Sequence, residues 1–154
     1  MRAQKSGKII VIGSIGGYIG LPYMSHYSAS KFALDGLVDA LRLEIAPFGV
    51  QVMAVHPGDV NTSFAEHQVY AGRTTPNSPY DVSYRKAVAH YVASMRDACG
   101  ADTIAAAVVN LAVQRYSLPP RLFVGSRVER GGVWLKALLP GAAFERVLRK
   151  ALGQ

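Results

Sequence analysis

The chain has 154 residues, 50% of them hydrophobic and 18% charged, which is enough to bury the core of one domain and too apolar for wholesale disorder. The single cysteine, Cys99, excludes an internal disulfide framework, and the four scattered histidines offer no metal-ligand spacing, so we expect no metal site and a reducing, cytoplasmic location. The formal net charge is +7, and the segment from Arg115 onward, with eight Lys and Arg against two Glu, carries +6 of it.

The first 58 residues predict a strand, a long helix and a second strand. Residues 8–14 are expected to form a strand, because Ile9, Ile10, Val11 and Ile12 are a continuous β-branched run, which is typical of a strand covered on both faces in a parallel sheet. Residues 27–46 have the periodicity of a helix with one apolar stripe, and Pro47 and Gly49 end it. Residues 51–55 form the second strand. This βαβ pattern predicts an α/β fold with a partial, doubly wound parallel sheet of the Rossmann type, of at most three strands.

The remainder of the chain predicts a long loop, two helices, one short strand and a tail. Residues 61–80 are rich in turn residues and too long for a plain connection, which is typical of a binding loop or lid. Helices are expected at 82–97 and 102–116, with Asp102 near the N-terminus of the second, and a strand at 121–125. We therefore divide the chain into a domain at 1–130, with a substrate-binding loop at about 61–100, and an amphipathic, basic tail at 131–154.

Three side chains capable of carbonyl chemistry are expected to meet at one end of this sheet. Tyr27 and Lys31 are four residues apart at the start of the long helix, so they share a face, and Ser14 ends the neighbouring strand. Ligands of open parallel sheets bind outside the carboxyl ends of the strands. Reduction of a carbonyl by hydride requires a proton donor, which a tyrosine beside a lysine can provide. Taken singly, each residue is more often a packing or surface residue.

The string that contains these residues resembles one known family. The matching positions are Gly7-Lys8-Ile9-Ile10-Val11-Ile12-Gly13-Ser14, Gly20, Pro22, Tyr27-Ser28-Ala29-Ser30-Lys31, Ala33-Leu34, Gly36, Leu41 and His56-Pro57-Gly58-Asp59-Val60-Asn61-Thr62. They resemble the short-chain dehydrogenase/reductase family, including its Tyr-x-x-x-Lys and Pro-Gly-x-Val-x-Thr motifs.

The resemblance implies a role for each matching site residue. Ser14 orients the substrate oxygen, Tyr27 is the general acid/base, and Lys31 stabilises the tyrosinate and binds the nicotinamide ribose. A second set of residues, together with Tyr27 and Lys31, binds the nicotinamide end of the cofactor, NAD or NADP: Pro57, Gly58, Val60 and Thr62. The family further implies a small-molecule alcohol or ketone as substrate, and a homo-oligomer that associates through the long helix.

Two parts of the family pattern are missing. The glycines at 13, 16, 17 and 20 are spaced G-x-x-G-G-x-x-G, which is not the G-x-G-x-x-G of a phosphate-binding turn, and they follow what matches the family's fifth strand. The family's catalytic Asn has no counterpart, since it precedes the position that matches Met1. We therefore expect the C-terminal half of a longer enzyme. The alternative is a truncated, non-catalytic fragment or interaction module, which would not bind nucleotide.

The aromatic residues of the substrate-side segments and the basic tail leave two further interpretations open. Most aromatic residues in or near these segments, among them Tyr70 and Tyr91, are expected to be packing residues, but loop aromatics around Tyr27 would suit a bulky, lipophilic substrate such as a steroid, retinoid or fatty-acyl derivative. The tail at 132–152, broken by Pro140 and Gly141, either packs on the domain or forms an interfacial helix that contacts anionic lipid. No groove-entering motif accompanies the positive charge, so we expect no nucleic-acid partner.

Overall fold

A three-stranded parallel sheet forms the centre of the fold. The computed structural model describes residues 1–67 and 78–152. Within them, β1 (Gly7–Ile12), β2 (Val50–Pro57) and β5 (Arg121–Val124) pair in the order β1-β2-β5. The α/β class, the parallel sheet and the three expected strands are thereby confirmed.

The other elements connect these strands or follow them. A second, two-stranded parallel pair joins β3 to β4 and was not expected from the sequence. The remaining elements, in chain order with β3 and β4, are η1 (Ile15–Gly17), α1 (Ser25–Ile45), η2 (Ala46–Phe48), β3 (Val60–Asn61), η3 (Ser63–His67), α2 (Asp81–Arg96), β4 (Cys99–Gly100), α3 (Ala101–Val113), α4 (Arg127–Leu138) and α5 (Gly141–Ala151).

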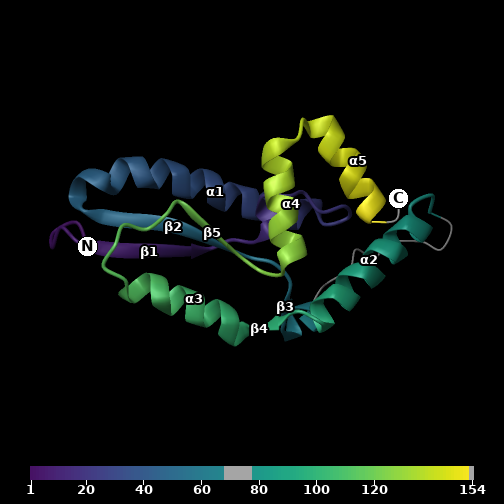
Figure 1. The fold of residues 1–154 in the computed structure, drawn as a ribbon, viewed down its shortest axis with the longest axis horizontal. Helices are drawn as coiled ribbons and strands as arrows, with labels where there is room; N and C mark the ends of the chain where they lie inside the picture. The colour runs from purple at the N-terminus through teal and green to yellow at the C-terminus, as the bar shows by residue number, and fades with distance from the viewer. Residues whose placement is uncertain (68–77, 153–154) are drawn as a thin grey trace.

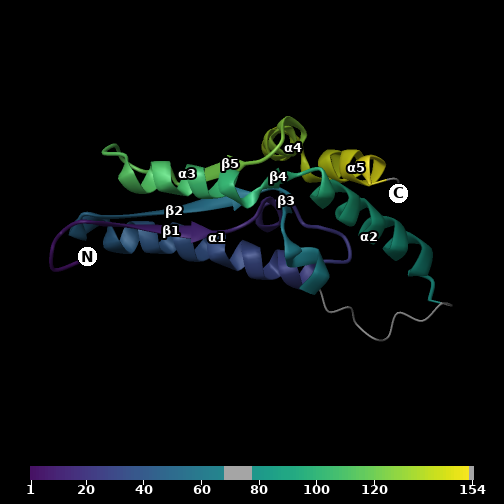
Figure 2. The same ribbon diagram turned by 90° about the horizontal axis from the view of Figure 1, so that it is seen from below.

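The helices α1 and α3 cover opposite faces of the sheet (Figures 1 and 2). Val52 and Ala54 of β2 point to α1 and pack with its fully buried Val38. Met53 and Val55, which alternate with them along the strand, point to the other face and pack with Leu111 of α3. Because successive strand residues face opposite sides, one buried strand supplies both halves of the core. This arrangement is the doubly wound pattern that the βαβ periodicity predicts.

The first strand packs on both faces, as expected, since Ile10 contacts the cluster on the α3 side while Ile9 and Val11 contact the cluster on the α1 side, but it is less completely buried than β2. The residues of β1 are partly buried, and Ile12 is 46% exposed, whereas four consecutive residues of β2, Met53 to His56, are 0% exposed. Among the described residues, β1 has a neighbouring strand on one side only, so its β-branched run lies at an edge of the sheet. The long helix also leaves apolar side chains uncovered, with Phe32, Leu37 and Leu43 exposed.

The third helix ends earlier than its sequence pattern indicates. The pattern extends to residue 116, but Gln114 leaves the helical conformation at ψ 148° and α3 stops at Val113. The Lys8 ammonium group donates hydrogen bonds to the carbonyls of Leu111, Ala112 and Gln114, the first two at 2.8 and 3.1 Å. A cation on the last free carbonyls of a helix stabilises its C-terminus, so a lysine 103 positions away from Leu111 fixes this end.

The helices α4 and α5 form a hairpin at the end of the sheet opposite the N-terminus (Figure 1). Val133 and Phe144 are buried there against Ile15 and Ile19 of the segment after β1. The Lys136 ammonium group donates to the Tyr18 carbonyl, and burial lowers its pKa. The tail therefore packs on its own chain. Within the described residues, no helix is both long enough and apolar enough to cross a membrane.

Candidate active site

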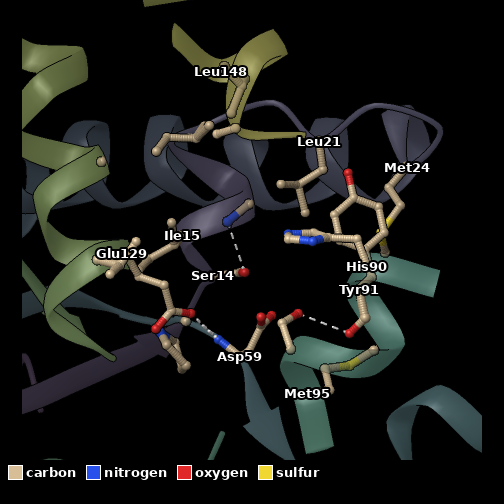
Figure 3. Close-up of a pocket in the computed structure, with 18 of the residues that line it drawn as sticks. Ser14, Ile15, Leu21, Met24, Asp59, His90, Tyr91, Met95, Glu129 and Leu148 are labelled. Carbon is tan, nitrogen blue, oxygen red and sulfur yellow. Dashed lines mark hydrogen bonds between the residues drawn. The ribbon is translucent and has the colours of Figure 1, made fainter. Parts of the chain in front are cut away.

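The segment after β1 places Ser14 at the carboxyl end of the sheet. Ser14 has extended backbone angles and caps η1, and its Oγ accepts a hydrogen bond from the Gly16 amide at 3.0 Å. Its carbonyl oxygen accepts a second hydrogen bond from the Gly17 amide at 2.8 Å. The side chain is thereby fixed at the edge of the cavity described below (Figure 3). The sequence prediction that a strand ends at this serine is confirmed to within two residues.

The first two turns of α1 carry Tyr27 and Lys31 to the same end of the sheet. Both side chains are partly buried, and the Lys31 Nζ lies 5.8 Å from the centroid of the Tyr27 ring. That ammonium group also donates to the Ile12 carbonyl at 3.4 Å, which ties it to the end of β1. The Tyr27 ring tilts against Phe64 at a centroid distance of 5.9 Å. The four-residue spacing does bring phenol and ammonium together.

Two glycines allow the serine segment to lie directly on α1. A Cβ added at Gly16 would lie 3.0 Å from Cε1 of Tyr27 and 3.4 Å from Oγ of Ser14. Only the backbone of Gly16 therefore lies between these two side chains. A Cβ added at Gly17 would lie 2.7 Å from Cβ of Lys31 and 2.8 Å from its carbonyl carbon. Gly16 and Gly17, which are not part of a phosphate-binding turn, therefore allow close packing around the candidate catalytic residues.

The turn after β2 holds the second set of predicted residues. Pro57, Gly58, Val60 and Thr62 all line the cavity that Ser14 and Tyr27 line. The turn is held by Glu129 of α4, whose carboxylate accepts hydrogen bonds from the Asp59 amide at 2.5 Å and from the Ser126 amide at 2.7 Å. Ser126 in turn caps α4, accepting from the Glu129 amide, so one carboxylate stabilises both a helix N-terminus and the turn.

The cavity between these elements has a volume of about 750 Å³, the size of a site for a drug-sized ligand. Its polar end lies at the carboxyl ends of β1 and β2. The opposite wall is apolar and includes Leu135 of α4 and Phe144, Val147 and Leu148 of α5. Lys31 does not line the cavity, and its ammonium group lies near the Tyr27 ring, behind the face that the ring presents to the cavity. Predicted residue Tyr70 falls outside the described residues.

Sequence reasoning missed a charge network next to Ser14, in which the buried His56 and the carboxylate of Asp35 contact each other and Arg121 pairs with Asp35. His56 is 0% exposed, and its Nδ1 lies 3.0 Å from the Ser14 carbonyl oxygen. Its Nε2 lies 3.0 Å from Oδ1 of Asp35, in a contact that lacks the alignment of a hydrogen bond, and its ring stacks on Phe123 at 5.0 Å. Arg121 pairs with Oδ2 of the same aspartate at 3.2 Å. The only sequence signal was the position of His56 immediately before Pro57-Gly58.

Residues of α2, which lies within the substrate-binding segment expected at about 61–100, form a further wall of the cavity. His90, Tyr91, Ser94 and Met95 line the cavity, and Figure 3 shows the first two facing Leu21 and Met24. The Tyr91 hydroxyl donates to the Pro22 carbonyl at 3.2 Å, and burial raises the pKa of Tyr91 to about 12, with the Asp59 charge acting in the same direction. The phenol therefore remains a neutral hydrogen-bond donor at physiological pH.

Within the described residues, no group of three or more His, Cys, Asp or Glu side chains could hold a metal ion. The arrangement instead offers a hydroxyl, a phenol and an ammonium group beside an open cavity. Such a set can bind a carbonyl or hydroxyl oxygen and exchange a proton with it.

Comparison with known proteins agrees with this chemistry. The family model described as short chain dehydrogenase matches residues 1–71. A 3-ketodihydrosphingosine reductase of Bacteroides thetaiotaomicron is 38% identical over 149 residues, which are 97% of this chain and 55% of the relative. The chain belongs to the short-chain dehydrogenase/reductase family.

Solved structures of short-chain dehydrogenases have the same fold. One from Streptomyces avermitilis aligns over 99% of this chain and 53% of its own, with a TM-score of 0.65 and 28% identity. Another from Burkholderia cenocepacia, solved in complex with NADP, aligns over 97% of this chain and 49% of its own, with a TM-score of 0.54 and 26% identity. The chain spans about half the length of the short-chain dehydrogenase/reductase relatives it matches.

The described residues fit the nicotinamide end of the cofactor that short-chain dehydrogenase/reductase proteins use. Pro57, Gly58, Val60 and Thr62 line a cavity that also reaches Ser14 and Tyr27, so a planar ring on that turn would lie in the same cavity as these two side chains. No glycine-rich phosphate-binding turn occurs among the described residues, since the glycines at 16 and 17 pack on Tyr27 and Lys31.

Proposed function

We propose that the protein is an NAD(P)-dependent oxidoreductase that interconverts a secondary alcohol and a ketone. The observation that carries this proposal is the meeting of Ser14 and Tyr27, with Lys31 behind the tyrosine, at one end of a cavity of about 750 Å³. Family membership supports the reaction class. The nicotinamide, when bound, supplies or accepts the hydride.

Each of the three residues has a distinct task in this reaction. The Ser14 hydroxyl binds the substrate oxygen, and its orientation is set by the Gly16 amide and by the contacts of the Ser14 carbonyl with the Gly17 amide and the His56 ring. Tyr27 gives its phenolic proton to that oxygen during reduction and takes a proton from it during oxidation. Lys31 stabilises the tyrosinate electrostatically, because its ammonium group lies near the phenol ring, and it binds the nicotinamide ribose.

The apolar wall supports a lipophilic substrate. Leu135, Phe144, Val147 and Leu148 lie opposite the polar end, where they can bury alkyl surface at about 25 cal/mol per Å². The related reductase from Bacteroides thetaiotaomicron is named for a ketone of a long-chain base, and a substrate of that class has the polar head and apolar chain that such a cavity suits.

The decisive experiment replaces Tyr27 by Phe in the enzyme and measures turnover and nucleotide binding. The substitution removes the transferable proton and leaves the ring packing on Phe64, so turnover should fall below a few per cent while nucleotide still binds. Retention of substantial activity would refute the role of Tyr27. Failure of the wild type to bind nucleotide at millimolar concentration would instead support a non-catalytic fragment.

Two accessory properties also remain proposals. The exposed Phe32, Leu37 and Leu43 on α1 support association of two copies through this helix. On the outer face of α4, Trp134 and Leu138 are 70% and 77% exposed in the basic segment, which supports peripheral contact with anionic lipid.

A further inference from the structure

The charge of the cavity is opposite to the charge of the protein. The chain has a net charge of +7, yet among the described residues that line the cavity there is no Lys or Arg, while there are two carboxyl groups, Asp59 and Glu129. Like charges repel and unlike charges attract, so this lining disfavours an anionic ligand.

The two carboxyl groups have different surroundings. The carboxylate of Glu129 is occupied by two backbone amides, those of Asp59 and Ser126, which hold the turn and cap α4. The carboxylate of Asp59 has no such amides among the hydrogen bonds of the described residues, and Figure 3 shows it pointing into the cavity, toward the Ser14 hydroxyl. Asp59 is therefore the acidic group that a ligand in the cavity can reach.

No Lys or Arg side chain among the described residues pairs with Asp59, although the His90 ring favours its charged form electrostatically. None of the ion pairs between described residues involves it, and its neighbour Ser94 offers only a hydroxyl within hydrogen-bonding reach. A partly buried carboxylate without a counter-ion is unfavourable, and a cation that binds beside it removes that penalty. Burial is the main cause that raises the pKa of Asp59, the Glu129 charge adds to it, and the Ser94 hydrogen bond and the His90 ring act in the opposite direction.

The neighbours of Asp59 define the rest of the ligand. Ser14 and Tyr27, which bind the reacting oxygen, lie in the same cavity, so the cation belongs near the alcohol or ketone. The wall of α4 and α5, with Leu135 and Leu148, accepts an alkyl chain. A primary ammonium group donates three hydrogen bonds and suits one carboxylate beside a serine hydroxyl.

We propose that Asp59 binds an ammonium group of the substrate, so that the enzyme selects long-chain amino ketones and amino alcohols over uncharged analogues of equal length. This inference rests on the proposed function, because it assumes that the cavity is the substrate site. It assigns to Asp59 the selection of the substrate, and to Ser14 and Tyr27 the chemistry.

The first test compares two substrates that differ in one group. The kcat/KM of the enzyme is measured with a long-chain 2-amino ketone and with the 2-hydroxy ketone of the same chain length. A charge-assisted hydrogen bond predicts a preference of about 10- to 100-fold for the amino ketone. Equal kcat/KM values for the two ketones would overturn the ammonium site while leaving the proposed function intact. Turnover of neither ketone would overturn both.

A variant pair separates a local effect from a general change of charge. Asp59→Asn keeps an oxygen acceptor for Ser94 and should abolish the preference by lowering kcat/KM for the amino ketone alone. Asp102→Asn makes the same change of charge on the exposed first turn of α3, outside the cavity, and should preserve the preference. Equal losses with both substrates in Asp59→Asn would mean that Asp59 is only structural.

A binding measurement tests the ammonium site without turnover. Calorimetry with decylamine and decanol should show tighter binding of the amine to the wild type, and the difference should vanish in Asp59→Asn. Even if that variant fails to fold, the comparison of amine and alcohol on the wild type decides the question. Equal affinity for amine and alcohol would contradict the proposal.

The same binding measurement has a predicted pH dependence. Glu129 from α4, and His90, Tyr91 and Ser94 from α2, face Asp59. Because the pKa of Asp59 is raised, its carboxyl gains a proton at a higher pH than an exposed aspartate, and amine affinity should decline as the pH falls from about 7 through that pKa. The titration is repeated in His90→Gln, so that Asp59 is tested without the neighbouring imidazole. A pH-independent amine affinity in that variant would refute the assignment.

Discussion

The contact between the serine segment and α1 leads to a sharp prediction for Gly17→Ala. The new Cβ would lie 2.7 to 2.8 Å from the Cβ, carbonyl carbon and carbonyl oxygen of Lys31, whereas ordinary contacts begin near 3.4 Å. Two of these three atoms are backbone, so a rotamer change cannot relieve the overlap. The segment that carries Ser14 must instead move away from the helix that carries Tyr27, by roughly half an ångström or more.

Both stability and rate should record this displacement. Overpacking of this kind costs about 1–3 kcal/mol, which lowers the Tm of a domain of this size by roughly 2–12 °C. A shift of the two catalytic side chains by a large fraction of an ångström lowers kcat by about 10- to 100-fold. The assays are thermal unfolding and steady-state turnover of the enzyme.

Gly20→Ala is the matched control, because a Cβ at that position would meet no atom within 4 Å. It should leave Tm and kcat close to those of the wild type, or raise Tm slightly by restricting the unfolded chain. If Gly17→Ala shows the wild-type Tm and kcat, the close packing of the two segments does not position the catalytic groups, and the reasoning fails.

Two further predictions concern the charge network and the tail. Asp35→Ala leaves the buried His56 without its carboxylate and should reduce the free energy of unfolding by about 3 kcal/mol in urea denaturation, whereas Asp39→Ala, at an aspartate with a side chain 54% exposed, should cost less than about 1 kcal/mol. Equal costs would mean that burial of the pair is unimportant. For the tail, the Trp134→Ala, Leu138→Ala double variant should sediment less with vesicles that contain anionic lipid, and about 0.5 M salt should weaken binding of the wild type by screening. Identical sedimentation of variant and wild type would reject lipid contact through this face.

Local sequence patterns predicted the elements that depend on local chemistry. The long helix was expected at 27–46 and spans Ser25–Ile45, and the strand expected at 51–55 is contained in Val50–Pro57. Apolar periodicity and the residues that end a helix are visible in a single stretch of chain, so both patterns gave the correct type of element. The spacing of Tyr27 and Lys31 likewise gave their juxtaposition.

Features set by distant residues were beyond that reasoning. The early end of α3 depends on Lys8, and the fixed turn after β2 depends on Glu129, 70 positions from Asp59. The coverage of both faces of β1 was predicted correctly, but its incomplete burial follows from its place at an edge of the sheet, which a β-branched run does not reveal. Asp59 was part of the recognised string, but its lack of a Lys or Arg partner among the described residues is visible only once α2 and α4 are packed against it.

The carboxylate of Glu129 also constrains how this region can change over evolutionary time. A Cβ at Gly58 would lie 2.1 Å from Oε1 of Glu129, and one at Gly125 would lie 2.8 Å from Oε2. A side chain at either glycine therefore requires the Glu129 carboxylate to move, which breaks its hydrogen bonds to the Asp59 and Ser126 amides. The three positions are coupled, and homologous sequences should show them varying together.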